Sequence, residues 1–197
     1  MRCYHRALLG SLVFLTAGID HVKPVQQPVQ QVIGRAKQAD LQVTRLPPSA
    51  FPALPPKIRR ELERRGCTMP QISPDKKPQN VIKGQFTGKG RADWAVLCSL
   101  NHVSTIYIFR NASEREPLEL APQSDANSLP DNGGAAIEYS RAISAVGREY
   151  ILKHYHAYGG PKPPAIDHQG INDTFVGKAS VVRYFYAGKW LQLTGAD

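Results

Sequence analysis

The sequence predicts a mainly β protein of the α+β class: an antiparallel β-meander or sandwich-like sheet with one short N-terminal helix packed on it. Short apolar runs with an alternating pattern recur from residue 80 onward, and turn signals rather than helical crossovers separate them. The 16 prolines and 16 glycines among 197 residues favour many turns and rigid loops over long helices. The chain is 42% hydrophobic and 21% charged, which is ordinary for a globular protein.

The first 18 residues have the layout of a signal peptide. Arg2 and Arg6 supply a positive start, residues 7–16 form an apolar run, and Thr16-Ala17-Gly18 offers small residues for cleavage. The apolar run is too short to span a bilayer as a helix. We therefore expect residues 1–18 to direct export to the periplasm or the extracellular space, with no transmembrane segment after cleavage. A buried N-terminal helix is the alternative.

Residues 19–53 are predicted to form a tether rich in proline and glutamine. Prolines interrupt any regular element in this stretch, and its glutamine-rich part is polar and weakly patterned. A β-rich domain is then expected over residues 54–197. The interrupting prolines are Pro24, Pro28, Pro47, Pro48 and Pro52.

The clearest helix is expected over residues 55–66. A Pro-Pro pair suits its first turn, and Gly66 suits the position just after its end. Ile58 and Leu62 form a narrow apolar stripe that can pack on a sheet. Basic residues crowd the rest of the surface, which we interpret as a solvated face, with a basic docking face as the alternative. They are Lys57, Arg59, Arg60, Arg64 and Arg65.

The cysteines predict a disulfide. Removal of the signal peptide takes Cys3 away and leaves Cys67 and Cys98, and an even pair in an exported chain favours a bridge. The chain-entropy model gives a loop of this length roughly 3–4 kcal/mol of stabilisation. Two reduced, buried thiols are the alternative.

The strands are expected to be short and to follow one another from residue 80 to the end of the chain. Asn101-His102 and Ala187-Gly188-Lys189 have the composition of hairpin turns. Residues 114–134 are expected to be loop-rich, and residues 159–164 to form a stiff connection. The expected strands cover residues 80–86, 94–100, 103–109, 135–144, 147–156, 180–186 and 190–193.

A glycine-punctuated loop runs directly into the strand that ends at Leu97. Its sequence matches the pattern Gly-Asp-Phe-Asn-Gly-Asp-Gly-x-x-Asp at Gly84, Phe86, Gly88, Gly90 and Asp93. Residues 84–97 therefore resemble an FG-GAP repeat, the repeat of integrin-type propellers, and the chain as a whole resembles small exported bacterial proteins that carry such a loop. The resemblance implies a tight loop between two strands, which in that family holds calcium.

The loop departs from that family at the positions that would hold the metal. Gln85, Thr87 and Lys89 stand where ligand oxygens would be expected, and a lysine cation opposes Ca²⁺. The sequence therefore predicts a loop that keeps the turn geometry and has lost most of its calcium ligands. Asp93 is expected to accept backbone N–H bonds across the loop instead.

A second loop, Asp167-His168-Gln169-Gly170-Ile171-Asn172-Asp173, is a weaker echo of the first. Its spacing offers oxygen ligands from Asp167, Gln169 and Asp173 around a glycine turn, which makes calcium one interpretation. A hydrogen-bonded Asx turn is the other interpretation.

His154 and His156 suggest a second metal chemistry. They are two residues apart on an expected strand, so both rings would share one face. With Asp167 and Asp173 they would form a metal site, such as a zinc site, that activates a water for hydrolysis. Ordinary surface or turn histidines are the alternative, which we favour. Neither a Gly-x-Ser-x-Gly nucleophile elbow nor a phosphate-cradling Gly-x-x-x-x-Gly-Lys-Ser/Thr loop occurs in the sequence. We assign no catalytic residue.

The net charge of +9 falls to about +7 without Arg2 and Arg6. Such a surface suits an envelope or extracellular protein, a membrane or an anionic polymer as partner, and solubility alone is the interpretation that we favour. The basic–aromatic alternation of a nucleic-acid-binding strand is missing. The sequence thus favours an exported, non-catalytic binding or interaction module without a cofactor, or with calcium or zinc. The alternatives are a metal-dependent hydrolase and an inhibitor of a secreted enzyme.

Overall fold

The computed structural model describes residues 34, 37–72, 77–129 and 139–195. The expected signal peptide over residues 1–18 and the first part of the expected tether lie outside these residues. The described chain is mainly β, with antiparallel sheets and three short helices. In this part of the chain, no helix is long and apolar enough to cross a membrane.

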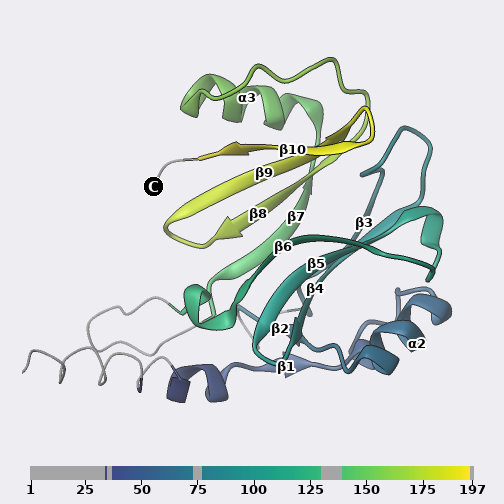
Figure 1. Cartoon of the computed structure of the whole chain (residues 1–197), viewed down its shortest axis with the longest axis vertical. Helices are drawn as coiled ribbons and strands as arrows, with labels where there is room; N and C mark the ends of the chain where they lie inside the picture. The colour runs from purple at the N-terminus through teal and green to yellow at the C-terminus, as the bar shows by residue number, and fades with distance from the viewer. Residues whose placement is uncertain (1–33, 35–36, 73–76, 130–138, 196–197) are drawn as a thin grey trace, which may run out of the picture.

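Four layers stack on one another in the order helix, sheet, sheet, helix (Figure 1). Helix α2 (Pro56–Arg65) covers the outer face of the first sheet, and helix α3 (Arg148–Tyr158) covers the outer face of the second. The inner faces of the two sheets pack against each other. The sequence predicted one sheet with one helix packed on it, whereas the structure has two four-stranded sheets, each covered by a helix.

The first sheet is a meander of four antiparallel strands in chain order. At the turn between β4 and β5, Asn101 and His102 both have positive φ, 50° and 61°, and Leu100 pairs with Val103. This is the two-residue hairpin loop that matches the strand twist, as the sequence predicted. Strand β6 lies inside the segment that was expected to be loop. The strands are β3 (Val81–Gly84), β4 (Asp93–Leu100), β5 (Val103–Phe109) and β6 (Leu118–Ser124).

The second sheet is also a four-stranded antiparallel meander in chain order. Strands β9 and β10 form the expected hairpin, in which Tyr186 pairs with Lys189 across Ala187 and Gly188. Strand β8 begins inside the second glycine loop, so Asp173 lies in a ladder and not in a turn. The strands are β7 (Arg141–Val146), β8 (Gly170–Phe175), β9 (Ala179–Tyr186) and β10 (Lys189–Thr194).

Helix α3 replaces the strand that was expected over residues 147–156. Its buried residues Ile151 and His154 are three apart, and the half-buried Tyr155 packs against the same core, so one helical face meets the second sheet. Gly147 precedes the helix in an extended conformation, and Gly159, with φ of 76°, follows it. The alternation of large and polar residues that suggested a strand is compatible with this helical face as well.

The described end of the expected tether is packed against the domain. Residues 37–42 are helical, β1 (Arg45–Leu46) pairs with β2 (Met69–Pro70), and a 3-10 turn covers Pro48–Ala50. Phe51 is buried in the core beneath α2. Prolines here end short elements without preventing packing, because each lies outside a continuous ladder. Two further 3-10 turns cover Arg110–Ala112 and Asp125–Ser128.

Three apolar clusters hold the layers together. The first joins α2 to the first sheet through Ile58 and Leu62, both fully buried. Cys67 and Cys98 belong to this cluster and stand at disulfide distance, with Cα atoms 5.5 Å apart. The second cluster lies between the sheets, and the third lies under α3. Their central members are Phe86, Leu97, Ile106, Ile108 and Ile171 in the second, and Ile151, Val182, Tyr184 and Leu193 in the third.

Candidate functional site

Asp93 closes the first glycine loop. Its Oδ2 accepts hydrogen bonds from the backbone N–H and the hydroxyl of Thr87, at 2.7 and 2.8 Å, and its Oδ1 accepts from the backbone N–H of Asn111 at 2.9 Å. The carboxylate is fully buried, so these donors replace the water it gives up. The expectation that Asp93 accepts N–H bonds across the loop is confirmed.

The other matched positions of this loop shape its path. Phe86 is fully buried between the sheets and anchors the loop to the core. A Cβ on Gly84 would lie 2.6 Å from two atoms of the Phe86 ring, so only glycine lets the ring fold back against the strand. Gly90 has φ of 77°, a conformation that favours glycine. Gly88 completes the turn, and its carbonyl accepts from the N–H of Arg91 at 3.3 Å.

The structure joins the two glycine loops, which are far apart in the sequence. The backbone N–H of Gln85 donates to the side-chain Oε1 of Gln169 at 3.0 Å, and the N–H of Gln169 donates to the backbone carbonyl of Gln85 at 3.0 Å. The side-chain Oε1 of Gln85 in turn accepts from the N–H of Gly90 at 2.6 Å. Gln85 was expected to have replaced a calcium ligand, and Gln169 was expected as a candidate calcium ligand. In the structure these two residues link the loops instead.

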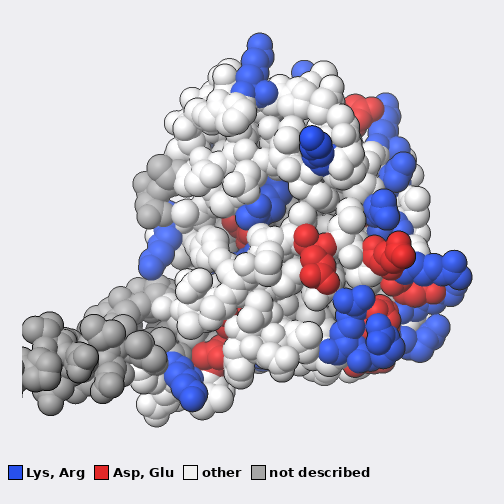
Figure 2. All heavy atoms as spheres, viewed as in Figure 1, with Lys and Arg blue, Asp and Glu red and all other residues white. Residues whose placement is uncertain are grey.

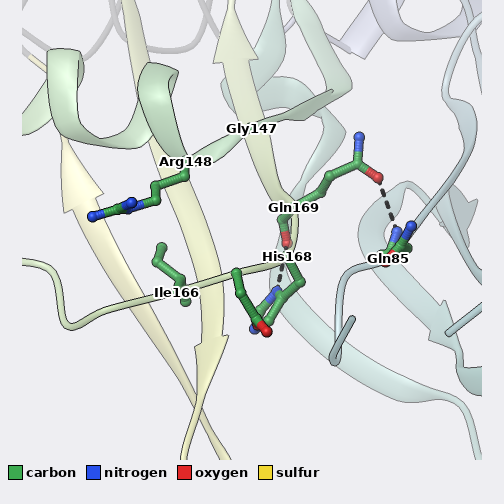
Figure 3. Close-up of a pocket in the computed structure, with 7 residues that line it drawn as sticks. Gln85, Gly147, Arg148, Ile166, His168 and Gln169 are labelled. Atoms are coloured by element: carbon green, nitrogen blue, oxygen red, sulfur yellow. Dashed lines mark hydrogen bonds between the residues drawn. The ribbon is translucent and has the colours of Figure 1, made fainter. Parts of the chain in front are cut away.

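A cleft of about 360 Å³ opens beside this junction (Figure 3). Arg148, the first residue of α3, extends over Ile166 on one side, and the Gln85–Gln169 pair stands on the other. His168 lies between the two sides. The cleft is lined by Gln85, Gly147, Arg148, Ile166, Asp167, His168 and Gln169. Its volume lies at the lower end of the range for small-molecule sites.

The residues that line the cleft offer hydrogen-bond donors and acceptors and charges of both signs. The Nδ1 of His168 lies 3.0 Å from the carbonyl of Gln169, which can only accept, so Nδ1 donates in this hydrogen bond and Nε2 is left for another partner. The Oε1 atoms of Gln85 and Gln169 are both engaged, while their NH₂ groups donate to no other described residue. Arg148 adds a cation and Asp167 an anion.

The structure does not bring the expected metal ligands together. His154 is buried against the second sheet, whereas His156, two residues further along the same helix, is exposed, because such residues point to different sides of a helix. The side-chain oxygen of Gln169 accepts a hydrogen bond from the backbone N–H of Gln85. Asp173 is buried, and both of its oxygens accept from Arg141, at 2.8 and 2.9 Å. Of the expected set, Asp167 lines the cleft beside Gln169, and neither the zinc nor the calcium arrangement is formed.

A different acidic cluster, Asp40, His102 and Asp125, lies within metal-binding distance in the described residues. A guanidinium already fills it: Arg45 donates to both carboxylates, with its Nη2 2.8 Å from Asp125 Oδ2. A second cation would meet this positive charge, so the cluster is an ion-pair network. No spacing in the sequence indicates it, because the three residues come from distant segments.

The network continues into the space between the sheets. Asp125 accepts from the hydroxyls of Ser99 and Ser104, and Ser104 contacts the phenol oxygen of Tyr139 at 2.9 Å. Burial raises the pKa of Tyr139 to about 12, so this phenol stays protonated at neutral pH. These side chains satisfy one another's hydrogen bonds and leave little exposed surface for a ligand.

No family model matches the chain. No curated protein and no solved structure gives a significant match. The resemblance of residues 84–97 to an FG-GAP repeat therefore stays a prediction carried by the loop residues themselves.

Proposed function

We propose that this chain is an exported, non-catalytic binding module that takes a small polar ligand in the cleft beside the two glycine loops. The observation that carries the proposal is the reciprocal pair of hydrogen bonds between Gln85 and Gln169, each at 3.0 Å. It fixes two loops from different sheets against each other, so one wall of the cleft is held in place before a ligand arrives. Preorganisation of this kind lowers the entropy cost of binding.

The lining favours binding over chemistry. Its polar members are side chains that hydrogen-bond in fixed planes: two glutamines, an arginine, an aspartate and a histidine. Asp167 and His168 are the lining residues with catalytic potential, and among the described residues they form no hydrogen bond with each other, whereas an activated nucleophile needs a base within hydrogen-bond reach. The expected His/His/Asp hydrolase is not favoured, because His154 is buried while His156 is exposed, and both oxygens of Asp173 accept from Arg141.

The charges of the cleft indicate a ligand with two kinds of group. Arg148 and the free NH₂ groups of the glutamines suit a carboxylate or another anion. The Asp167 carboxylate suits an ammonium or hydroxyl donor. A small zwitterion, such as a free amino acid or the end of a short peptide, offers both.

Export is the second part of the proposal. One support is the signal-peptide-like composition of residues 1–18. The other is the Cys67–Cys98 pair at disulfide distance, because disulfide bonds form and persist in oxidising compartments. Sequencing the N-terminus of protein recovered from the secreted or periplasmic fraction tests it. We expect the mature chain to begin near residue 19, and a chain that retains Met1 in the cytosol contradicts it.

The cleft is tested by titrating ¹⁵N-labelled protein with glycylglycine, with acetate and with methylammonium, and following backbone amide resonances. We expect glycylglycine to give saturable shifts at Gly147, Arg148, His168 and Gln169, and to bind more tightly than either single charge. Arg148→Gln is expected to weaken it at least about tenfold, because a charge-assisted hydrogen bond is lost.

Arg115→Gln is the matched control, since Arg115 is exposed and does not line the cleft. It is expected to leave the affinity unchanged. An absence of saturable shifts at the cleft with all of the probes overturns the proposed ligand class, and so does an Arg148→Gln protein that binds glycylglycine as the original does.

A further inference from the structure

The outer surface of α2 carries the densest group of positive charges on one described element. Lys57 and Arg60 are exposed, and Arg64 keeps 69% of its side chain exposed. Figure 2 shows a group of blue side chains with red ones among them at the lower right, where Figure 1 places α2. We name this surface the basic face. It consists of Lys57, Arg59, Arg60, Arg64 and Arg65.

The helix beneath the basic face is held firmly. Ile58 and Leu62 are fully buried against the first sheet. Gly66, with φ of 74°, ends the helix, and its N–H donates to the carbonyl of Glu63 at 2.9 Å. Cys67 follows at once and stands at disulfide distance from Cys98 on β4. The cations therefore project from a rigid platform rather than from a loose tail.

Acidic side chains neutralise only part of the basic face: Arg64 and Arg65 pair with Glu61, and Arg65 also lies 3.8 Å from Glu119. Glu61 accepts hydrogen bonds from Arg64 and from Arg65, each at 2.7 Å, and these bonds lower the pKa of Glu61 to about 2. The negative charge of Glu61 therefore pairs with two cations of the same helix. Among the described residues, Lys57, Arg59 and Arg60 form no ion pair. A shallow hollow of about 210 Å³ lies among Lys57, Arg60, Glu61, Arg64 and Glu114.

We propose that the basic face of α2 docks on the surface of an anionic phospholipid bilayer. The charges are complementary, and the cations spread over the surface of a helix that lies along the protein, as contact with a planar array of headgroups requires. The apolar residues of α2 are buried, so attachment is electrostatic and needs no insertion. This docking is independent of the proposed cleft ligand, because α2 and α3 form opposite outer layers.

A nucleic acid is the competing anionic partner. Strand-tracking sites combine basic grooves with aromatic side chains for base stacking, and α2 contains no aromatic residue. The Glu63 carboxylate is also exposed among the cations, where it would repel a phosphate backbone that came close along its whole length. Anionic lipid headgroups move laterally within a bilayer, so they can avoid the Glu63 carboxylate.

The test is co-sedimentation with vesicles of phosphatidylcholine alone and of phosphatidylcholine with phosphatidylglycerol, using the same N-terminus in every protein. We expect partitioning onto the anionic vesicles only, and a steep fall as salt shortens the Debye length. Lys57→Gln/Arg60→Gln is expected to lower the partition coefficient by roughly 20- to 30-fold, since each cation near such a surface contributes independently. Both side chains are exposed, so the variant is expected to keep the thermal stability of the original protein.

Lys178→Gln/Lys189→Gln is the matched control. It removes the same charge from exposed positions in the β8–β9 turn and at the start of β10, and it is expected to leave vesicle binding nearly unchanged. Equal losses in the two variants overturn the proposal, because net charge alone would then explain binding. Failure to bind anionic vesicles at low salt also overturns it, as does tighter binding to duplex DNA than to the vesicles.

Discussion

Arg141 and Asp173 form a two-pronged ion pair in the interior of the protein. Arg141 Nε lies 2.8 Å from Asp173 Oδ1, and Arg141 Nη2 lies 2.9 Å from Oδ2. The guanidinium also donates to the backbone carbonyls of Ser104 and Ala121, each at 3.0 Å, which belong to the other sheet. One side chain thus ties β7 and β8 of the second sheet to β5 and β6 of the first.

Asp173→Asn is expected to destabilise the fold strongly. Arg141 is fully buried, and the substitution leaves its charge without a counter-ion. Breaking a buried pair in this way costs about 3–5 kcal/mol. The free energy of unfolding, measured by urea denaturation, checks this. Asp167→Asn removes the same charge from the cleft, outside this ion pair, and is expected to change stability by less than about 1 kcal/mol; equal effects of the two substitutions would contradict the account.

Gly84→Ala is expected to disturb the junction of the two loops. The new methyl group would lie 2.6 Å from Phe86 ring atoms and 2.9 Å from Gln169 Oε1. Overpacking of this kind costs about 1–3 kcal/mol. The amide resonances of Gln85 and Gln169 should move together, and the urea midpoint should fall.

Gly147→Ala is the control for this prediction. A Cβ at Gly147 meets nothing within 4 Å, and the backbone there has an ordinary φ of −85°. Because glycine is preferred to alanine at a helix N-cap, we expect a loss of about 0.5–1 kcal/mol, smaller than that of Gly84→Ala. If both alanine variants lose stability equally, crowding at the junction is not the cause.

The Cys67–Cys98 pair is expected to contribute roughly 3–4 kcal/mol to the free energy of unfolding under oxidising conditions. The double variant Cys67→Ala/Cys98→Ala should lose at least this amount, and adding a reductant to the original protein should shift its urea midpoint in the same direction. The double variant itself should not respond to the reductant. An original protein that is equally indifferent to reductant would show that the bridge is absent.

The strands that the sequence predicted well are rich in β-branched and aromatic residues and lie next to clear turn residues. Residues 103–109 and the β9–β10 hairpin have this composition, and Asn101 and Gly188 in their turns have positive φ, 50° and 81°. Strand β6 escaped prediction because it contains Pro122, which favours a loop in a sequence taken alone. β6 is an edge strand, where a proline is tolerated.

The geometry of the cleft could be predicted only in part. The glycine pattern indicated the turn at residues 84–93, and Asp93 does close it. The meeting of Gln85 with Gln169 could not be predicted, because nothing local in either segment specifies a partner in the other sheet. Asp173 was assigned to metal since its partner, Arg141, lies on a neighbouring strand that a single sequence does not pair with it.

His154 is expected to make the stability of the protein depend on pH. The side chain is only 5% exposed, Tyr158 packs against it with ring centroids 4.8 Å apart, and Nε2 has no hydrogen-bond partner among the described residues. Burial lowers the pKa of His154, and a hydrogen bond with the Leu193 backbone offsets this only in part. The folded protein therefore resists the proton that the unfolded chain accepts near pH 6.5.

The sign of the effect follows from this difference. Above about pH 6.5 both states are neutral at this residue and its contribution is complete, whereas at lower pH protonation favours the unfolded chain until the folded pKa is reached. The free energy of unfolding, measured by urea denaturation between neutral and mildly acidic pH, should thus fall as the pH falls. His154→Leu should flatten the curve over this range, and His156→Leu, which changes an exposed imidazole two residues away, should leave it as steep as before. A His154→Leu curve with the original slope would assign the pH dependence to other groups.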